Sequence, residues 1–272
     1  MVLFSLHQYD GWVNIKPMNE LDLEAAPAAP LAEILRPKTL DDVVGQAQLL
    51  GPQGRLRLML AHGSLGSIIF WGPPGTGKTT IARLLADAAD MAFEPISAVF
   101  DGVGELRKVF DRAAQRRLQG QRTLLFVDEV HRFNKAQQDG LLPRVEDGTV
   151  TLVGATTENP SFALNGALLS RAQVLVLDRL DRAALEAILS RLEAHIGLDL
   201  PIDDDARTAL LGMADGDGRY LLNMASLLVE MPATTRLDSR GLAELVAGRA
   251  PAFDRAGDQH YNLMSALHKT LR

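Results

Sequence analysis

The chain contains no cysteine among its 272 residues. Disulfide bonds and thiolate metal sites are therefore excluded, and a reducing compartment such as the cytoplasm is favoured. Its apolar runs are short, and none approaches the roughly 20 residues that a membrane-spanning helix needs. The N-terminal sequence MVLFSLHQYDGW lacks the basic start and the long apolar stretch of a signal peptide. The sequence therefore favours a cytoplasmic protein that has no membrane partner.

The chain also lacks an excess of basic residues, because 28 lysines and arginines stand against 34 aspartates and glutamates, a formal net charge of −6. Such a protein has no global positive field to attract nucleic acid, so contact with DNA would need a local patch. Lys108, Arg112 and Arg116 form one candidate, spaced four residues apart on a helix expected at 105–118. The same spacing is typical of a solvated helix face, which is the commoner explanation.

A glycine-rich sequence, GPPGTGKT, matches the pattern of a phosphate-binding loop. Its glycines let successive backbone N–H groups turn toward phosphate oxygens. Lys78 supplies positive charge for the β- and γ-phosphates, and Thr79 supplies a hydroxyl for Mg²⁺. A short apolar run precedes the loop and a helical pattern follows it, so the phosphates would lie at a helix N-terminus. The predicted nucleotide-binding residues of this segment are Gly72, Pro73, Pro74, Gly75, Thr76, Gly77, Lys78, Thr79 and Thr80.

Two carboxylates, Asp128 and Glu129, directly follow the apolar residues LLFV, which predicts that they lie at the end of a buried strand. We expect Asp128 to hold Mg²⁺ and Glu129 to orient or deprotonate an attacking water. A kinase would not need the second carboxylate, so the pair favours hydrolysis of the nucleotide. His131 follows in a loop. A single histidine cannot complete a metal site, so we interpret it as structural or as part of signalling between subunits.

Apolar runs alternate with helical patterns up to residue 177. Strands are predicted at 67–71, 92–96, 123–127, 149–154 and 173–177. The alternation predicts an α/β fold with a parallel sheet covered by helices on both faces. Beyond residue 177 the pattern is helical, with helices predicted at 181–195, 203–213, 219–230 and 239–248, and with Asp181 and Asp203 as N-caps.

The chain divides into segments of different character. Residues 1–30 are acidic and end in an Ala/Pro stretch, so we expect a flexible tail, with Met18 as an alternative start. Residues 31–178 would form the nucleotide-binding domain, residues 179–250 a helical lid, and residues 251–272 the start of a further helical domain. The helical pattern near the end stops at HKTLR without a stop signal, so we expect a C-terminal truncation.

Several motifs together resemble the AAA+ ATPases, namely GPPGTGKT, FVDE, GATTENP, LLSRA and GDGR. The segments HRFNKAQQD and HYNLMSALHK are more specific, and they are similar to the replication-associated recombination protein A (RarA/MgsA) family, whose eukaryotic relative is the Werner helicase-interacting protein. The likeness covers about residues 30–272. It implies a AAA+ P-loop core, an all-helical lid domain, and ATP with Mg²⁺ as ligands.

The resemblance also implies roles for residues that look ordinary on their own. Thr157 would be sensor 1, which helps to place the attacking water. Arg171 would be an arginine finger offered in trans to the nucleotide of a neighbouring subunit. Arg219 would be sensor 2, which ties the lid to the γ-phosphate. The residues that lie where the family forms part of its adenine pocket are Arg36, Val43 and Val44.

The family resemblance implies an ATPase that acts on DNA at stalled replication forks, in recombination and repair. Its expected partners are single-stranded gaps, duplex ends or forks, together with single-stranded-DNA-binding protein and replisome components. The full-length protein would be a homo-oligomer, cytoplasmic and associated with the nucleoid. Two alternatives stay open: a clamp-loader-type ATPase subunit that acts on a sliding clamp, and a nucleotide-gated binding module with negligible turnover. A pure switch would not need the water-activating Glu129.

Overall fold

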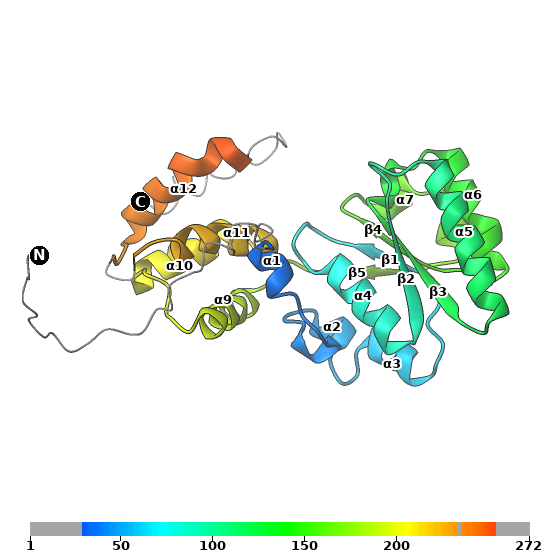
Figure 1. Cartoon of the computed structure of the whole chain (residues 1–272), viewed down its shortest axis with the longest axis horizontal. Helices are drawn as coiled ribbons and strands as arrows, with labels where there is room; N and C mark the ends of the chain where they lie inside the picture. Colours follow the sequence, from blue (N-terminus) through cyan, green and yellow to red (C-terminus); the bar gives the residue numbers. More distant parts are fainter. Residues whose placement is uncertain (1–28, 233–234, 254–272) are drawn as a thin grey trace, which may run out of the picture. The chain divides into compact units, whose positions relative to one another are not determined.

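The computed structural model describes residues 29–232 and 235–253. A sheet region comes first in the chain and a helical region follows it (Figure 1). Most of the predicted N-terminal tail, including Met18, and the helical pattern near the C-terminus lie outside the described residues. Within the part that is described, no helix combines the length and the apolar character needed to cross a bilayer.

A parallel sheet forms the centre of the first region, with the strand order β2-β3-β4-β1-β5 (Figure 1). This order confirms the predicted parallel sheet, and each predicted strand is present with ends shifted by at most two residues. It also brings the ends of β3, β4 and β1 side by side, where ligands bind in open parallel sheets. The strands are β1 Ile68–Trp71, β2 Met91–Ser97, β3 Arg122–Asp128, β4 Thr151–Thr156 and β5 Gln173–Val176.

Alternate side chains of each strand pack on opposite faces of the sheet. Ile68 and Phe70 belong to one buried cluster, while Ile69, between them, belongs to another. Burial on both faces explains why the strands read as continuous apolar runs rather than as alternating ones. The first cluster includes side chains of α2 Ala47–Leu50, α3 Arg55–Ala61 and α4 Lys78–Ala88. The second includes side chains of α5 Val103–Leu118, α6 Lys135–Glu146 and α8 Gly166–Leu169.

The edge strand β2 carries a proline and a largely buried carboxylate. Pro95 cannot donate to a sheet ladder, which an edge position tolerates. The Glu94 side chain is only 10% exposed, and it accepts hydrogen bonds from Arg112 Nη2 at 2.7 Å and Arg116 Nη1 at 2.5 Å. The bonds from Arg112 and Arg116 hold the pKa of Glu94 below its ordinary value. Lys108 pairs with Glu105 at 2.9 Å, so the basic stripe on α5 is matched by carboxylates of its own region.

The helical region consists of α9 Arg182–Ile196, α10 Asp204–Ala214, α11 Gly218–Val229 and α12 Ser239–Phe253. The two predicted N-caps are confirmed, because Asp181 accepts from the N–H of Ala184 at 2.8 Å and Asp203 accepts from that of Ala206 at 2.7 Å. The last helix extends to Phe253, beyond its predicted end at residue 248.

The first described helix packs with the helical region. Helix α1, Leu31–Ile34, is followed by Leu35, whose buried side chain joins the apolar cluster of α9, α10 and α11. Val44 packs on the same cluster, while Val43 packs on the cluster under α4. The chain therefore contacts the helical core before it enters the sheet, which the linear order of the motifs does not reveal.

Candidate nucleotide-binding site

The glycine-rich loop joins the end of β1 to the start of α4. Gly75 and Gly77 have φ angles of +67° and +98°, which glycine adopts far more readily than other residues. Gly77 is the N-cap of α4, and no side chain caps this end of the helix. The first-turn N–H groups of an eleven-residue helix are thus left for an anion, and such a helix start favours phosphate.

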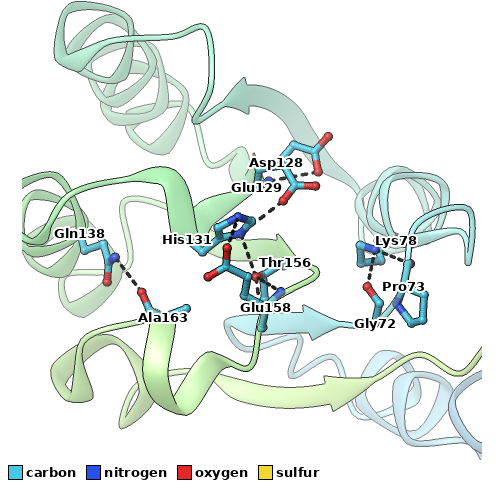
Figure 2. A network of polar contacts seen from close by, with 10 residues as sticks. All are labelled: Gly72, Pro73, Lys78, Asp128, Glu129, His131, Gln138, Thr156, Glu158 and Ala163. Atoms are coloured by element: carbon cyan, nitrogen blue, oxygen red, sulfur yellow. Dashed lines mark hydrogen bonds and ion pairs between the residues drawn. The ribbon is translucent and has the colours of Figure 1, made fainter. Parts of the chain in front are cut away.

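Lys78 is folded back onto the loop that carries it (Figure 2). Its Nζ donates to the carbonyl oxygen of Gly72 at 2.8 Å and to that of Pro73 at 2.7 Å. Burial lowers the pKa of Lys78, and the Glu129 and Asp128 carboxylates oppose that shift. An ammonium group has more donors than these two bonds use, so one remains for a phosphate oxygen.

The predicted acidic pair lies at the end of β3, which β4 separates from β1 in the sheet. Asp128 is the last residue of β3, and its Oδ1 accepts from the backbone N–H of Glu129 at 3.2 Å. Glu129 has a φ of +51°, a left-handed conformation that is uncommon for a residue other than glycine. Backbone strain of this kind is concentrated at functional sites. Both carboxylates act electrostatically on Lys78, so the structure brings the predicted lysine and acidic pair into one site.

His131 connects the acidic pair to the end of β4 (Figure 2). The segment is a short 3₁₀ helix, η2 Val130–Arg132, rather than the loop that we expected. The His131 side chain is 4% exposed, and its Nδ1 lies 3.3 Å from Glu129 Oε2 and 3.0 Å from Thr156 Oγ1. Its Nε2 lies 3.3 Å from Glu158 Oε1. His131 therefore links the end of β3 to the end of β4 within the sheet region.

Two adjacent threonines have different surroundings. Thr156 ends β4 with its side chain buried, and its Oγ1 accepts from the N–H of Glu158 at 3.0 Å. Thr157, the residue expected to act as sensor 1, follows the strand and is exposed. The sequence interpretation missed Thr156 and Glu158. The repeated threonine was visible, but which of the two is buried depends on where β4 ends, and sequence patterns place strand ends only to within a few residues.

Arg219 lies close to the glycine-rich loop. The N–H of its neighbour Gly218 donates to the carbonyl oxygen of Gly75 at 3.2 Å, which brings the start of α11 against the loop. The exposed Arg219 guanidinium also acts electrostatically on Lys78 and on Glu33. This position agrees with a residue that joins the helical region to a bound nucleotide.

Arg171 lies after α8 and is held by groups of its own subunit. Its Nε donates to Glu146 Oε1 at 2.5 Å, and its Nη1 donates to the carbonyl oxygen of Ala167 at 2.9 Å. The side chain is 39% exposed. Glu146 carried no predicted role.

The residues expected near the adenine lie beside the start of α4. Arg36 Nη1 donates to Thr80 Oγ1 at 3.2 Å, and Arg36 also pairs with Glu33. That pairing lowers the pKa of Glu33. Val43 and Val44 follow a short 3₁₀ helix, η1 Leu40–Asp42, and both are half-buried. The three predicted residues thus come from the segment that passes between the two apolar clusters.

The donor set fits a nucleoside triphosphate with a hard divalent cation. The loop offers backbone N–H groups and an ammonium to phosphate oxygens. The Thr79 hydroxyl lies on the first turn of α4, and the Asp128 carboxylate ends β3. Hydroxyl and carboxylate oxygens are ligands that Mg²⁺ accepts in phosphate sites.

Two family models match the sequence. One is described as "ATPase family associated with various cellular activities (AAA)" and matches residues 68–180. The other is described as "AAA C-terminal domain" and matches residues 197–272.

Curated relatives match along most of the chain. The replication-associated recombination protein A of Haemophilus influenzae is 46% identical over 252 residues, which are 89% of this chain and 56% of that protein. The protein of the same name from Escherichia coli K12 is 44% identical over 265 residues, which are 93% of this chain and 59% of that protein. The ATPase WRNIP1 of Dictyostelium discoideum is 38% identical over 268 residues, 90% of this chain and 31% of that protein. The chain thus spans a little over half the length of these two bacterial relatives.

Solved structures of a related motor share the fold. The Thermotoga maritima RuvB Holliday junction branch migration motor superposes with a TM-score of 0.62 at 26% identity, covering 79% of this chain and 72% of that chain. A point variant of the same protein gives a TM-score of 0.63.

Proposed function

This chain belongs to the AAA ATPase family, in the group of replication-associated recombination protein A, and we propose that it hydrolyses ATP to act on DNA at stalled replication forks. The observation that carries the proposal is the meeting of Lys78, Asp128 and Glu129 at the carboxyl ends of β1 and β3, on either side of β4. Lys78 and the loop bind the triphosphate, and Glu129 serves the water that attacks it. A binding module that only switched with nucleotide would not need the second carboxylate.

The residues around the acidic pair have different roles in ATP hydrolysis. Thr79 and Asp128 would hold Mg²⁺, which supplies positive charge to the phosphate oxygens. Glu129 accepts the proton of the attacking water as the bond from water to the γ-phosphorus forms and the bond to ADP breaks. Thr157 helps to place that water. The backbone N–H groups and Lys78 stabilise the charge that develops on the phosphate oxygens.

Two arginines complete the site from outside the loop. Arg219 joins the helical lid of this proposal, residues 179–250, to the γ-phosphate, which is supported by its electrostatic influence on Lys78. Arg171 acts on the nucleotide of a neighbouring subunit, which is supported by its partly exposed position between α8 and β5. Such an arginine is worth about 10³–10⁵ in turnover, so efficient hydrolysis requires a homo-oligomer. The nucleotide-binding domain of this proposal spans residues 31–178, and Arg36, Val43 and Val44 contact the adenine.

DNA is the macromolecular substrate in this proposal, because the named relatives act in replication-associated recombination and the similar RuvB is a branch migration motor. Single-stranded gaps, duplex ends and forks are the candidate structures, and single-stranded-DNA-binding protein and replisome components are the candidate protein partners. We place the protein in the cytoplasm with the nucleoid on the same grounds.

The test is the steady-state ATPase rate of the full-length gene product with single-stranded, duplex-end and forked DNA, with a sliding clamp as a separate arm. We expect stimulation by at least one DNA form, and a Lys78→Ala variant that binds ATP more weakly in calorimetry. Stimulation by the clamp alone would favour a clamp-loader-type subunit. Absence of adenine nucleotide binding to the unaltered protein would overturn the proposal.

A further inference from the structure

The segment HRFNKAQQD, residues 131–139, connects the acidic pair to the part of the chain that carries Arg171. Phe133 is buried at the end of η2, and Asn134 caps α6 by accepting from the N–H of Gln137 at 2.9 Å. In turn, Gln137 Oε1 accepts from the N–H of Asn134 at 3.0 Å. The beginning of α6 is therefore fixed directly after the end of β3 and η2.

Gln138 is a buried glutamine, 3% exposed, whose amide joins three backbone segments. Its Nε2 donates to the carbonyl oxygen of Phe133 at 2.9 Å. It also donates to the carbonyl oxygen of Ala163 at 3.3 Å (Figure 2). Its Oε1 accepts from the backbone N–H of Asn165 at 2.8 Å. The three partners belong to the end of η2, the end of α7 (Pro160–Ala163) and the N-cap of α8.

A second hydrogen bond, between Asn165 and Asp139, also joins α8 to α6. Asn165 Nδ2 donates to Asp139 Oδ1 at 2.7 Å, while Asn165 Oδ1 accepts from the N–H of Leu168 at 2.8 Å. Asn165 thus caps α8 and is itself bound to α6. At the other end of α6, Glu146 binds the guanidinium of Arg171. Helix α6 therefore holds the short helix before Arg171 at one end and Arg171 itself at the other.

We propose that Gln138 is a positioning residue for the arginine that each subunit offers to its neighbour, acting through Asn165 and α8. The inference rests on the proposed role of Arg171 in trans. Helix α8 has only four residues, and a helix this short is not stable by its own hydrogen bonds. Its direction, and with it the starting point of the Arg171 side chain, depends on what its first residue is bound to.

The same amide ties this segment to the end of β3, because Phe133 lies four residues beyond Glu129. A buried amide with both donor and acceptor satisfied is rigid, since breaking one bond leaves a buried polar group unpaired. Gln138 thus fixes Arg171 relative to the core of its own subunit. A displacement of about 1 Å in such a group can cost about 100-fold in rate.

The test uses complementation between variants of the full-length gene product, because Gln138 should matter only in the subunit that donates the arginine. A Glu129→Gln subunit cannot turn over its own ATP but offers Arg171. An Arg171→Ala subunit has an intact acidic pair but offers no arginine. Mixed together, the two should recover ATPase activity.

Gln138→Leu is then placed in either partner. In the donor, which is the Glu129→Gln subunit that offers Arg171, Gln138→Leu should reduce the recovered ATPase rate about 10- to 100-fold. In the acceptor, which is the Arg171→Ala subunit with the intact acidic pair, Gln138→Leu should leave the recovered ATPase rate close to that of the parental mixture. The ATP affinity of this subunit in calorimetry should also be unchanged. Equal losses in both arrangements, a loss confined to the acceptor, or no loss in either would overturn the proposal. Failure of the parental mixture to recover activity would instead overturn the trans role of Arg171, and this inference with it.

A milder variant covers the case in which Gln138→Leu does not fold. Asp139→Ala removes the parallel bond to Asn165 from an exposed position, so the core remains intact. It should give the same donor-only loss with a smaller size, and an unaltered donor would count against the proposal. Lys135→Ala, an exposed change on the first turn of the same helix, is the matched control and should complement fully.

Discussion

The sheet region and the helical region use acidic residues for different purposes. In the helical region, aspartates cap helices: Asp181, Asp203 and Asp217 each accept a first-turn N–H bond at the start of α9, α10 and α11. In the sheet region, the N-cap residues of α6, α7 and α8 are asparagines, and the N-cap residue of α4 is a glycine. The acidic pair there ends a strand instead. The uncharged, uncapped start of α4 keeps the positive end of its dipole available to an anion.

Asp217 both caps a helix and lies beside the phosphate-binding loop. It caps α11, yet a side chain at Gly75 would collide with it, so the aspartate lies directly against the phosphate-binding loop. Its charge raises the pKa of Lys78, in opposition to burial. The contrast predicts that changes to charge in the sheet region alter rates by orders of magnitude, while changes to the caps alter stability by small amounts.

The largest of these effects is expected at Glu129. Glu129→Gln removes the base for the attacking water, so turnover should fall by about 10²–10⁴, the usual contribution of general base catalysis. ATP affinity should be retained, because the loop and Lys78 are untouched. Single-turnover ATPase and calorimetry measure the two quantities, and Glu105→Gln on α5 is a matched control. Unchanged turnover in Glu129→Gln would show that Glu129 is not the base for the attacking water.

The next largest effect is expected at Glu94 on the edge strand, and it concerns the free energy of unfolding. The folded-state pKa of Glu94 is depressed by Arg112 and Arg116, so its contribution is complete above the unfolded pKa and is lost as pH falls through the folded pKa. Glu94→Gln should lower the free energy of unfolding at neutral pH by about 1.5–3 kcal/mol. Urea unfolding between neutral pH and acid should show a weaker pH dependence in the variant. Parallel profiles for the two proteins would contradict this.

A somewhat smaller loss is expected at Gly75. An alanine Cβ there would lie 1.8 Å from Asp217 Oδ1, and φ is +67°. Gly75→Ala must therefore displace the start of α11 or strain the loop, at a cost of about 1–3 kcal/mol. We expect weaker ATP binding in calorimetry. Gly63→Ala, also at positive φ but with open space around it, controls for the backbone term alone. An equal loss of ATP affinity in both variants would show that the contact with Asp217 is unimportant.

The smallest effect belongs to a cap. Asp203→Ala removes the side-chain bond to the N–H of Ala206 and should cost about 1 kcal/mol of unfolding free energy, without change in ATP affinity. Asp203→Asn keeps the bond and should lose only the charge–dipole part, about a few tenths of a kcal/mol. Thermal unfolding at low and high salt separates the two terms. If both variants lost the same amount, charge rather than hydrogen bonding would be the source of the cap's stability.

The loop and the acidic pair could be predicted because their chemistry is encoded locally. Glycines at positive φ, a lysine and a threonine in one short motif leave little choice of structure, and the apolar run before Asp128 shows that a strand ends there. The cap predictions at Asp181 and Asp203 were right for the same reason.

What could not be predicted depends on contacts between distant residues. Gln138 binds Ala163 and Asn165, which lie far along the chain. No local pattern distinguishes it from Gln137, which binds the N-cap residue of the same helix. The charges on α5 looked like a surface stripe because Glu94 lies on a strand whose position over α5 appears only in the folded sheet. Leu35 likewise joins a core formed by residues from the far end of the described chain.

The buried ammonium of Lys78 has a consequence for the evolution of the protein. Its depressed pKa means that folding places a cation where water has been largely removed, so the empty protein holds this lysine at the expense of its own stability. Lys78→Met should therefore unfold at a higher temperature than the parent when no nucleotide is present, and should lose that advantage when ATP is added. Selection for stability and selection for ATP hydrolysis therefore favour different residues at position 78.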